Sequence, residues 1–401
     1  LTNEATLGAY LAANLRKVDT DQIYQSIATL INADSASEIA LVESATVAWT
    51  RSFYAAAEYA ISKGNGDVML CCEAEYAANL VAMQKLAMER GARLIAVPSF
   101  EDSGIVDIGA FQSMLDDPTI GPKVRLVCMT HIPTNSGIVN PMEQIGEIID
   151  AFNKKKRGND SSSTTKDKEV IFLVDACQSV GQRVVDVRSM NCHILTATGR
   201  KYLRGPRGTG FLYVRNDIVD KLVPTHIDHE AAPVIAVPEK PVAEDVSFRY
   251  RDGARRFEFW ESSIADRLGL GAAVDHALEI GMDVIECQCS NLGMQLQNQL
   301  REIPGVKVHH DHIHHAGGKD GQCTQCGIVT FTVDSHPSKD IVFGMLEEGF
   351  AISMTSATST PLDTSRSKCS DVVRASLTYF NSIDEIDDFC RVLRGLLEQR
   401  R

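Results

Sequence analysis

The sequence predicts an α/β fold in which helices cover both faces of a mostly parallel sheet, followed by a smaller C-terminal α+β domain. Short apolar runs of strand type alternate with amphipathic helical stretches from residue 38 to residue 214. Two long helical segments then follow, before further strands and a closing helix. The length of 401 residues, 44% of them hydrophobic, also exceeds what one core usually contains.

The expected strands of the main sheet are apolar and bounded by polar or turn residues. Helical stretches with apolar residues at helical spacing separate them at 46–63, 77–90 and 141–153. Because parallel strands need crossover connections, this alternation predicts helices on both faces of the sheet. The seven strands are expected at 38–42, 67–72, 93–98, 124–130, 170–175, 193–198 and 209–214.

The two ends of the chain have a different pattern. Residues 3–33 are expected to be helical with a break near 19–21. The C-terminal part is expected to hold helices at 263–279, 283–302 and 383–398, and strands at 327–333, 351–355 and 372–379. We therefore expect a helical segment at 1–33, a large domain at 34–265 and a small domain at 266–401.

Charge and composition narrow the class of protein. The formal net charge of -13 comes from scattered acidic residues, which argues against nucleic-acid or anionic-membrane partners. Apolar stretches stay well short of about twenty residues, so a membrane span is not expected. The eleven cysteines lie mostly inside apolar runs, which favours reduced thiols and a cytoplasmic protein.

One block of sequence, residues 170–214, carries the chemistry. Asp175 ends an apolar strand, Thr198 ends the next, and Lys201 follows in a polar, glycine-rich turn. Ligands of such sheets gather at the strand carboxyl ends, so the carboxylate and the amine are expected at one edge. A buried lysine can form an imine with an aldehyde cofactor, and a carboxylate can keep a pyridinium nitrogen protonated. Taken singly, each residue type is usually structural; their shared context favours catalysis.

The order of motifs in this block resembles the class V aminotransferase superfamily. The stretch D-A-x-Q-x-x-G is followed by T-G-x-K and then by G-P-x-G-x-G-x-L. Within the superfamily, TATGRKYLRGPRGTGFLYV is most similar to a branch containing the hercynylcysteine sulfoxide lyase of ergothioneine biosynthesis. Matching stretches extend from about residue 38 to residue 393. The resemblance implies fold type I, with pyridoxal 5'-phosphate (PLP) as cofactor.

The resemblance assigns roles to the central residues. It implies that Lys201 holds PLP as a Schiff base and moves protons at the substrate α-carbon, while Asp175 pairs with the pyridinium nitrogen. Gln178 would approach the phenolic oxygen or the imine of the cofactor. Thr198 and Arg200 would hold its phosphate, Arg200 replacing a histidine that is common in the desulfurases.

Further cofactor contacts follow from the matching stretches. Ala45 and Thr46 begin a helix whose free N–H groups would bind the phosphate. Tyr76, in the stretch EYAAN, is the candidate for stacking on the pyridine ring, although the strict register places Ala77 there. Thr134 or Asn135 would contact the cofactor from the loop THIPTN, and the choice between them stays open.

Two other contacts concern the substrate and a second subunit. Arg374 matches the arginine that binds the substrate α-carboxylate, which a guanidinium can hold through two parallel hydrogen bonds. Ser262 and Ser263 fall where a partner subunit donates a phosphate contact in relatives. A homodimer with shared active sites is therefore expected, with a small amino acid as substrate.

The shared motif does not select the reaction, because PLP supports several. Cysteine desulfurases carry a nucleophilic cysteine about fifteen residues before the carboxylate-binding arginine, where this chain has Ser359. Persulfide formation is therefore disfavoured. The leading hypothesis is β-elimination from a cysteine S-conjugate or sulfoxide, releasing pyruvate and ammonia; the alternative is an aminotransferase or epimerase.

A non-enzymatic alternative rests on an apparent insertion at 309–326. Its histidines and cysteines suit zinc or copper, but their spacing matches no closed zinc motif. We therefore expect no metal in the active site. A second apparent insertion, 154–168, lacks apolar residues and is interpreted as a surface loop. The metal-binding candidates are His309, His310, His312, His314, His315, Cys323 and Cys326.

Overall fold

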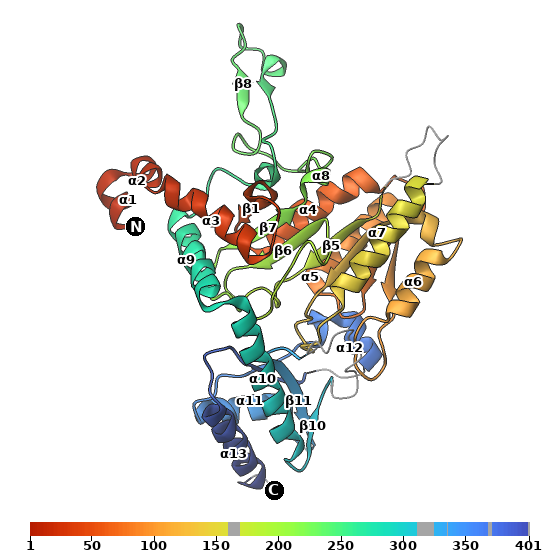
Figure 1. Ribbon diagram of the computed structural model, residues 1–401, viewed down its shortest axis with the longest axis vertical. Coiled ribbons are helices and arrows are strands. Elements are labelled where there is room, and N and C mark those ends of the chain that lie inside the picture. Colours follow the sequence, from red (N-terminus) through yellow and green to blue (C-terminus); the bar gives the residue numbers. More distant parts are fainter. Residues whose placement is uncertain (159–168, 311–324, 335, 368–370, 400–401) are drawn as a thin grey trace.

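The computed structural model describes residues 1–158, 169–310, 325–334, 336–367 and 371–399. A seven-stranded sheet forms the centre of the large domain, in the order β1-β7-β6-β5-β4-β2-β3 (Figure 1). Only β7 runs antiparallel to its neighbours, so the expected mostly parallel sheet is confirmed. The strands are β1 (Ile39–Val42), β2 (Val68–Cys72), β3 (Arg93–Val97), β4 (Val124–Thr130), β5 (Ile171–Asp175), β6 (Ile194–Thr198) and β7 (Gly210–Val214).

Alternate residues of each strand feed two separate cores, one on each face of the sheet. Leu70 of β2 packs under α3 (Lys17–Leu30), α6 (Ile108–Asp116), α7 (Met142–Gly158) and α9 (Ile264–Ile280). Its neighbour Cys71 packs on the opposite face, against α4 (Ala45–Ala60) and α5 (Ala77–Arg90). Every strand except the edge strand β3 is buried throughout, which explains the continuous apolar runs.

The N-terminal segment is helical as expected, but it is broken elsewhere. It forms α1 (Thr2–Leu7), α2 (Ala9–Leu15) and α3, with breaks at Gly8 and Arg16. The expected break near 19–21 is wrong, because Asp19 lies in the first turn of α3 and pairs with Arg16. Gly8 adopts a φ of 82°, a conformation that favours glycine and ends α1.

The small domain is built on a four-stranded antiparallel sheet, β10-β11-β13-β12. The long helix α10 (Met282–Arg301) follows α9 and packs on this sheet, whereas α9 packs against α3 of the large domain. The two helices and most strands match the prediction, and β10 was not expected. The division into an N-terminal segment at 1–33, a large domain at 34–265 and a small domain at 266–401 remains a prediction. The other elements are β10 (Val306–Val308), β11 (Ile328–Val333), α11 (Ser338–Glu347), β12 (Ser353–Met354), α12 (Pro361–Ser367), β13 (Val373–Ser376) and α13 (Ile383–Gln399).

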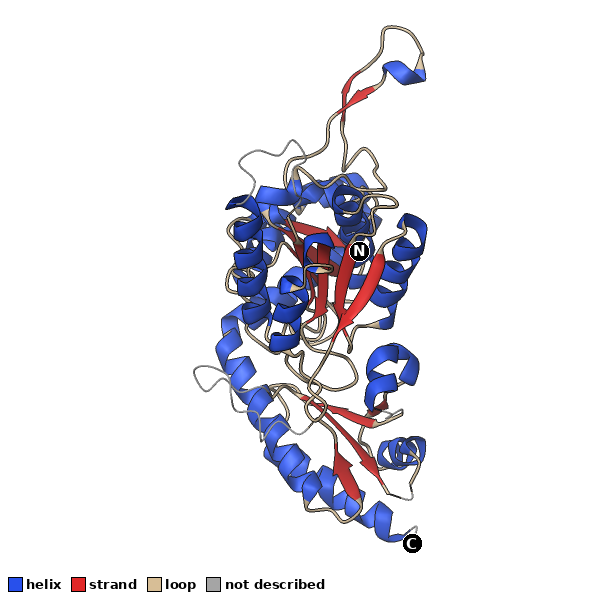
Figure 2. Ribbon diagram, turned by 90° about the vertical axis from the view of Figure 1, so that its right-hand side faces the viewer, coloured by secondary structure: helices blue, strands red, loops and turns tan. Residues whose placement is uncertain are grey.

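A hairpin arm, residues 233–250, extends away from the body of the large domain (Figure 2). It holds β8 (Val234–Ala236) and β9 (Ser247–Phe248), which form their own two-stranded sheet. The residues of both strands are exposed, and the sequence pattern did not indicate them.

The two apparent insertions lie partly outside the described residues. The expected loop at 154–168 is wrong at its start, because α7 continues through Lys154 to Gly158. Basic side chains at its C-terminal end favour this continuation through the helix dipole. Residues 159–168 and 311–324 lie outside the described part. Within the described part, no helix has the length and apolarity needed to cross a membrane.

Candidate active site

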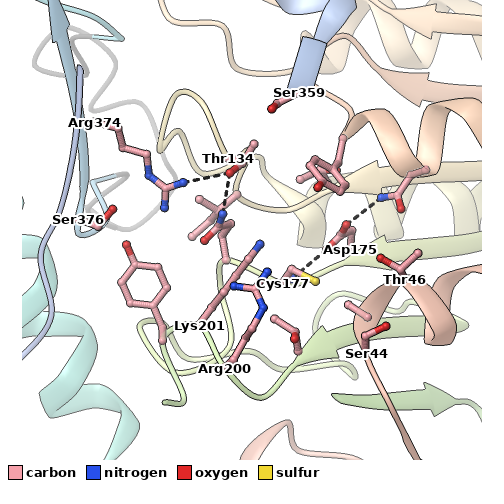
Figure 3. A pocket seen from close by; sticks show the side chains of 18 of the residues that line it. Ser44, Thr46, Thr134, Asp175, Cys177, Arg200, Lys201, Ser359, Arg374 and Ser376 are labelled. Atoms are coloured by element: carbon pink, nitrogen blue, oxygen red, sulfur yellow. Dashed lines mark hydrogen bonds between the residues drawn. The ribbon is translucent and has the colours of Figure 1, made fainter. Parts of the chain in front are cut away.

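A cavity of about 500 Å³ lies at the carboxyl ends of the parallel strands, bounded on one side by the small domain (Figure 3). Strand ends of β4, β5 and β6, the starts of α4 and α5, and β13 all contribute to it. It brings together residues that are far apart in the sequence. Its lining consists of Ser44, Ala45, Thr46, Tyr76, Asn79, Thr130, Ile132, Thr134, Asp175, Cys177, Gln178, Thr198, Arg200, Lys201, Tyr202, Ser359, Arg374, Ser376 and Thr378.

Asp175 ends β5 and is 6% exposed. Its Oδ2 accepts a hydrogen bond of 2.8 Å from Nδ2 of Asn79, and its Oδ1 accepts one of 2.9 Å from the backbone N–H of Cys177. Burial and the charge of Asp175 hold the pKa of the Cys177 thiol well above its ordinary value. The site therefore has a fixed carboxylate, and beside it a thiol that stays protonated.

A second acidic residue, Glu75, is linked to Asp175 through Asn79 and is fully buried, at 0% exposure. Its Oε1 accepts hydrogen bonds from Tyr76 N, Asn79 Nδ2 and Thr130 Oγ1 at 3.1, 2.9 and 2.7 Å. The Asn79 amide therefore bridges Glu75 and Asp175. Burial, and then the charge of Asp175, raise the pKa of Glu75 to about 7.

The raised pKa of Glu75 predicts a pH-dependent stability. The folded protein holds this proton more tightly, so the stabilisation is complete below the ordinary pKa of 4.5 and is lost as the pH rises through about 7. Replacing Glu75 by Gln, which mimics the protonated acid, should remove that loss. From pH 5 to pH 8, urea unfolding should show Glu75→Gln gaining about 2.5 kcal/mol over wild type. Glu147→Gln, at an exposed position of α7, is the control; an equal gain there would contradict the assignment.

The start of α4 and the turn after β6 form the other end of the cavity. Ser44 caps α4 by accepting a 3.2 Å hydrogen bond from Val47 N. The N–H groups of Ala45 and Thr46 lie in the first turn, where a helix offers no backbone partner. Gly210 lets β7 approach this turn, because a Cβ there would lie 2.9 Å from the Ser44 carbonyl carbon. With Arg200 nearby, this end is suited to an anion.

Lys201 lies between the carboxylate of Asp175 and the small-domain wall of the cavity (Figure 3). It follows β6 in the turn that starts at Gly199, where a Cβ would lie 2.3 Å from Thr209 Oγ1. Glycine is therefore required for the turn that presents the lysine. Burial and Asp175 raise the pKa of the neighbouring Cys177 thiol, and the charge of Lys201 offsets only part of that rise.

Thr134 joins the two domains at the small-domain side of the cavity. Its Oγ1 accepts hydrogen bonds from Gln178 Nε2 at 2.9 Å and from Arg374 Nη1 at 3.0 Å (Figure 3). Among the described residues, Oε1 of Gln178 and Nε of Arg374 have no hydrogen-bond partner although both atoms are buried. A ligand that bonds these atoms would remove the cost of leaving them unsatisfied.

The structure brings most of the predicted site residues together around the cavity. The exceptions are Asn135, Ser262 and Ser263. Thr134 lines the cavity, whereas the amide of Asn135 points to Ser356 O and Thr360 Oγ1 instead. Tyr76 lines the cavity and Ala77 does not. Ser262 and Ser263 line a separate small cavity beside Glu43 and Gly208.

The sequence did not indicate several residues of the lining. Ser44 could have been found as a helix N-cap, and the others had no local signal because only tertiary packing brings them to the cavity. These residues are Ser44, Asn79, Thr130, Ile132, Cys177, Tyr202, Ser376 and Thr378.

The residues present fit PLP in each of its chemical parts. Asp175 offers a carboxylate for the ring nitrogen, and Lys201 offers an amine for the aldehyde. The start of α4 offers free N–H groups for the phosphate, and the buried, unpartnered Gln178 Oε1 and Arg374 Nε face the same space.

The family model for aminotransferase class-V matches residues 11–389. The chain belongs to the class V aminotransferase family. The expected superfamily is thus confirmed, and with it PLP as the cofactor. The branch of the ergothioneine lyase is not distinguished by this match.

Curated relatives in the family include cysteine desulfurases. The cysteine desulfurase of Dickeya dadantii (strain 3937) is 27% identical over 376 residues, covering 94% of this chain and 80% of that protein. Solved structures share the fold. A cysteine desulfurase from Thermococcus onnurineus NA1 superimposes with a TM-score of 0.78 at 21% identity, covering 97% of this chain and 86% of that one. A complex of the cystine C-S lyase C-DES with its product cysteine persulfide superimposes with a TM-score of 0.75 at 21% identity. The superposition covers 96% of this chain and 88% of that one.

Described members of the histidine-rich segment have other contacts. His309 Nε2 lies 2.9 Å from Thr332 Oγ1, and His310 Nδ1 lies 3.3 Å from the Ser103 carbonyl. The Cys326 thiol donates to the Gly137 carbonyl. The described residues contain no cluster of three metal-ligating side chains. His312, His314, His315 and Cys323 lie outside the described part.

Proposed function

We propose that this class V enzyme is a carbon–sulfur lyase that eliminates the sulfur substituent from a cysteine S-conjugate or sulfoxide. The observation that carries the proposal is the placement of Lys201, Asp175 and Arg374 around one cavity. An amine, a ring-nitrogen partner and a carboxylate anchor are the groups that PLP chemistry on an amino acid requires.

Different residues of the cavity carry out different steps of the elimination. Bound PLP supplies an electron sink for the α-carbon. Arg374 binds the substrate carboxylate, and Lys201 removes the α-proton at Nζ. The Cβ–S bond then breaks, and its electron pair leaves with the sulfur group. Water completes the reaction, giving pyruvate and ammonia.

Ser359 supports elimination over persulfide formation. It is the last residue of the short 3-10 helix Ala357–Ser359 and lines the cavity, where a desulfurase nucleophile would be a cysteine. A serine hydroxyl cannot accept sulfur as a persulfide. The thiol in the described lining, Cys177, has a pKa raised by burial and is therefore a poor nucleophile.

The sulfoxide of hercynylcysteine is the proposed natural substrate class. The proposal rests on the resemblance of residues 196–214 to the branch that cleaves it. The polar lining beyond Arg374, with Ser376, Thr378 and Ser359, supports a polar distal group.

A homodimer is proposed, with Ser262 and Ser263 contributing to the partner's site. They do not reach the cavity of their own chain, but they lie beside Glu43 and Gly210, next to its phosphate end. Large apolar side chains of α1 and α2 are exposed, including Tyr10 at 80%. Exposed apolar surface of this kind is typical of an interface.

An assay of products tests the function. The protein is loaded with PLP and given S-substituted cysteines and cysteine sulfoxides. It should release pyruvate, ammonia and the sulfur product in equal amounts when no keto acid is added as an amino-group acceptor. Turnover that requires a keto acid would instead establish an aminotransferase. Sulfur transfer from free cysteine at a comparable rate would contradict the argument from Ser359.

A further inference from the structure

Tyr202 directly follows Lys201 and lines the cavity, yet its hydroxyl has no hydrogen-bond partner among the described residues. The side chain is 7% exposed, and its ring is held in a small apolar cluster with Ile132, Cys326 and Ile328. In the described part of the chain, no group forms a hydrogen bond with the Tyr202 hydroxyl, whose oxygen is buried. A buried hydroxyl without a partner costs free energy unless a ligand supplies one.

Polar groups of the small domain lie next to this hydroxyl. Burial raises the pKa of Tyr202 far above its ordinary value, while the charge of Arg374 and the hydroxyl of Ser376 offset part of the effect. The Ser376 hydroxyl lies beside Tyr202 but does not meet hydrogen-bond geometry. Tyr202 therefore keeps its proton and remains a donor next to the guanidinium.

Arg374 and Thr134 both keep a donor that no described residue uses. Nη1 of Arg374 is occupied by Thr134, whereas Nε has no partner in the described residues. Thr134 accepts two hydrogen bonds at Oγ1, so its own proton is available for a ligand. An ionised carboxylate has about four acceptor positions, more than one arginine edge can fill.

We propose that the Tyr202 hydroxyl is a second anchor for the α-carboxylate of the amino-acid substrate, donating to it beside Arg374. This inference rests on the proposed function. Tyr202 is thereby a binding residue that fixes the orientation of the α-carbon next to Lys201, its immediate neighbour in sequence. A hydrogen bond from a neutral donor to a carboxylate is charge-assisted and stronger than one between neutral groups.

The Tyr202→Phe variant removes the hydroxyl and keeps the packed ring. Binding is measured on the PLP-loaded protein by the change in cofactor absorbance, using L-alanine and ethylamine. Alanine has the carboxylate but no leaving group, and ethylamine lacks the carboxylate. Tyr202→Phe should raise the Kd for alanine about 10- to 100-fold and change that for ethylamine less than about two-fold.

Tyr213→Phe is the control, because this buried tyrosine on β7 lies outside the cavity lining. An alanine Kd unchanged in Tyr202→Phe, or equal losses for both ligands, would overturn the inference and leave only a packing role. Normal PLP absorbance in the variant would show that the proposed cofactor site itself is intact. Absence of that absorbance in the wild-type protein would overturn the proposed function and this inference with it.

Discussion

Lys201→Ala is expected to lose both the PLP absorbance band at about 410–430 nm and at least about 10³-fold of the elimination rate. The substitution removes the amine that bonds the aldehyde and the group that takes the α-proton. These are two roles of one atom, Nζ of a lysine that lines the cavity. The measurement is an absorbance spectrum together with pyruvate release at saturating PLP.

Lys63→Ala provides the matched control for this loss. Lys63 is an exposed lysine just after α4, far from the lining, and its removal makes the same change in charge. It should leave the spectrum and the rate unchanged. A Lys201→Ala protein that keeps the band would show that PLP is bonded elsewhere.

Arg374→Ala is expected to raise KM for the amino-acid substrate at least about 30-fold, with a smaller effect on kcat. Removing one partner of a buried charged hydrogen bond costs about 2–5 kcal/mol, because the substrate carboxylate loses its compensating charge. Arg374 lies on β13 and also holds Thr134, so the loss has a local structural part. Steady-state kinetics measure the KM, and the absorbance spectrum verifies that PLP is retained.

Arg374→Lys separates charge from geometry. A lysine keeps the charge but cannot form two parallel hydrogen bonds, so it should recover only part of the KM. Full recovery would show that a single charge suffices, and an unchanged KM in Arg374→Ala would place the carboxylate elsewhere.

The main sheet was predictable because every strand except β3 is buried throughout and therefore appears in the sequence as a continuous apolar run. The hairpin arm was not, because the residues of β8 and β9 are exposed and carry no alternation. The break in the N-terminal helices was also predicted at the wrong position. The polar run at Asp19 was interpreted as a break, whereas the local backbone at Gly8 decides it.

The site was predictable where the chemistry follows a strand end. Asp175 and Lys201 were expected from the sequence to lie at one sheet edge, and they line one cavity. Asn79 is 96 residues from Asp175, and only the parallel packing of β2 and β5 around β4 brings its amide there. Tyr202 had no signal, because an aromatic residue after a turn is usually a core residue.

The most direct test of the central claim is to reduce the PLP-loaded protein with borohydride and map the pyridoxyl label by peptide mass spectrometry. Borohydride fixes the carbon–nitrogen bond between the cofactor and its lysine. The account predicts one labelled peptide, carrying the pyridoxyl group on Lys201, and no labelled peptide from Lys201→Ala. Label on another lysine, or none in the wild-type protein, would contradict it.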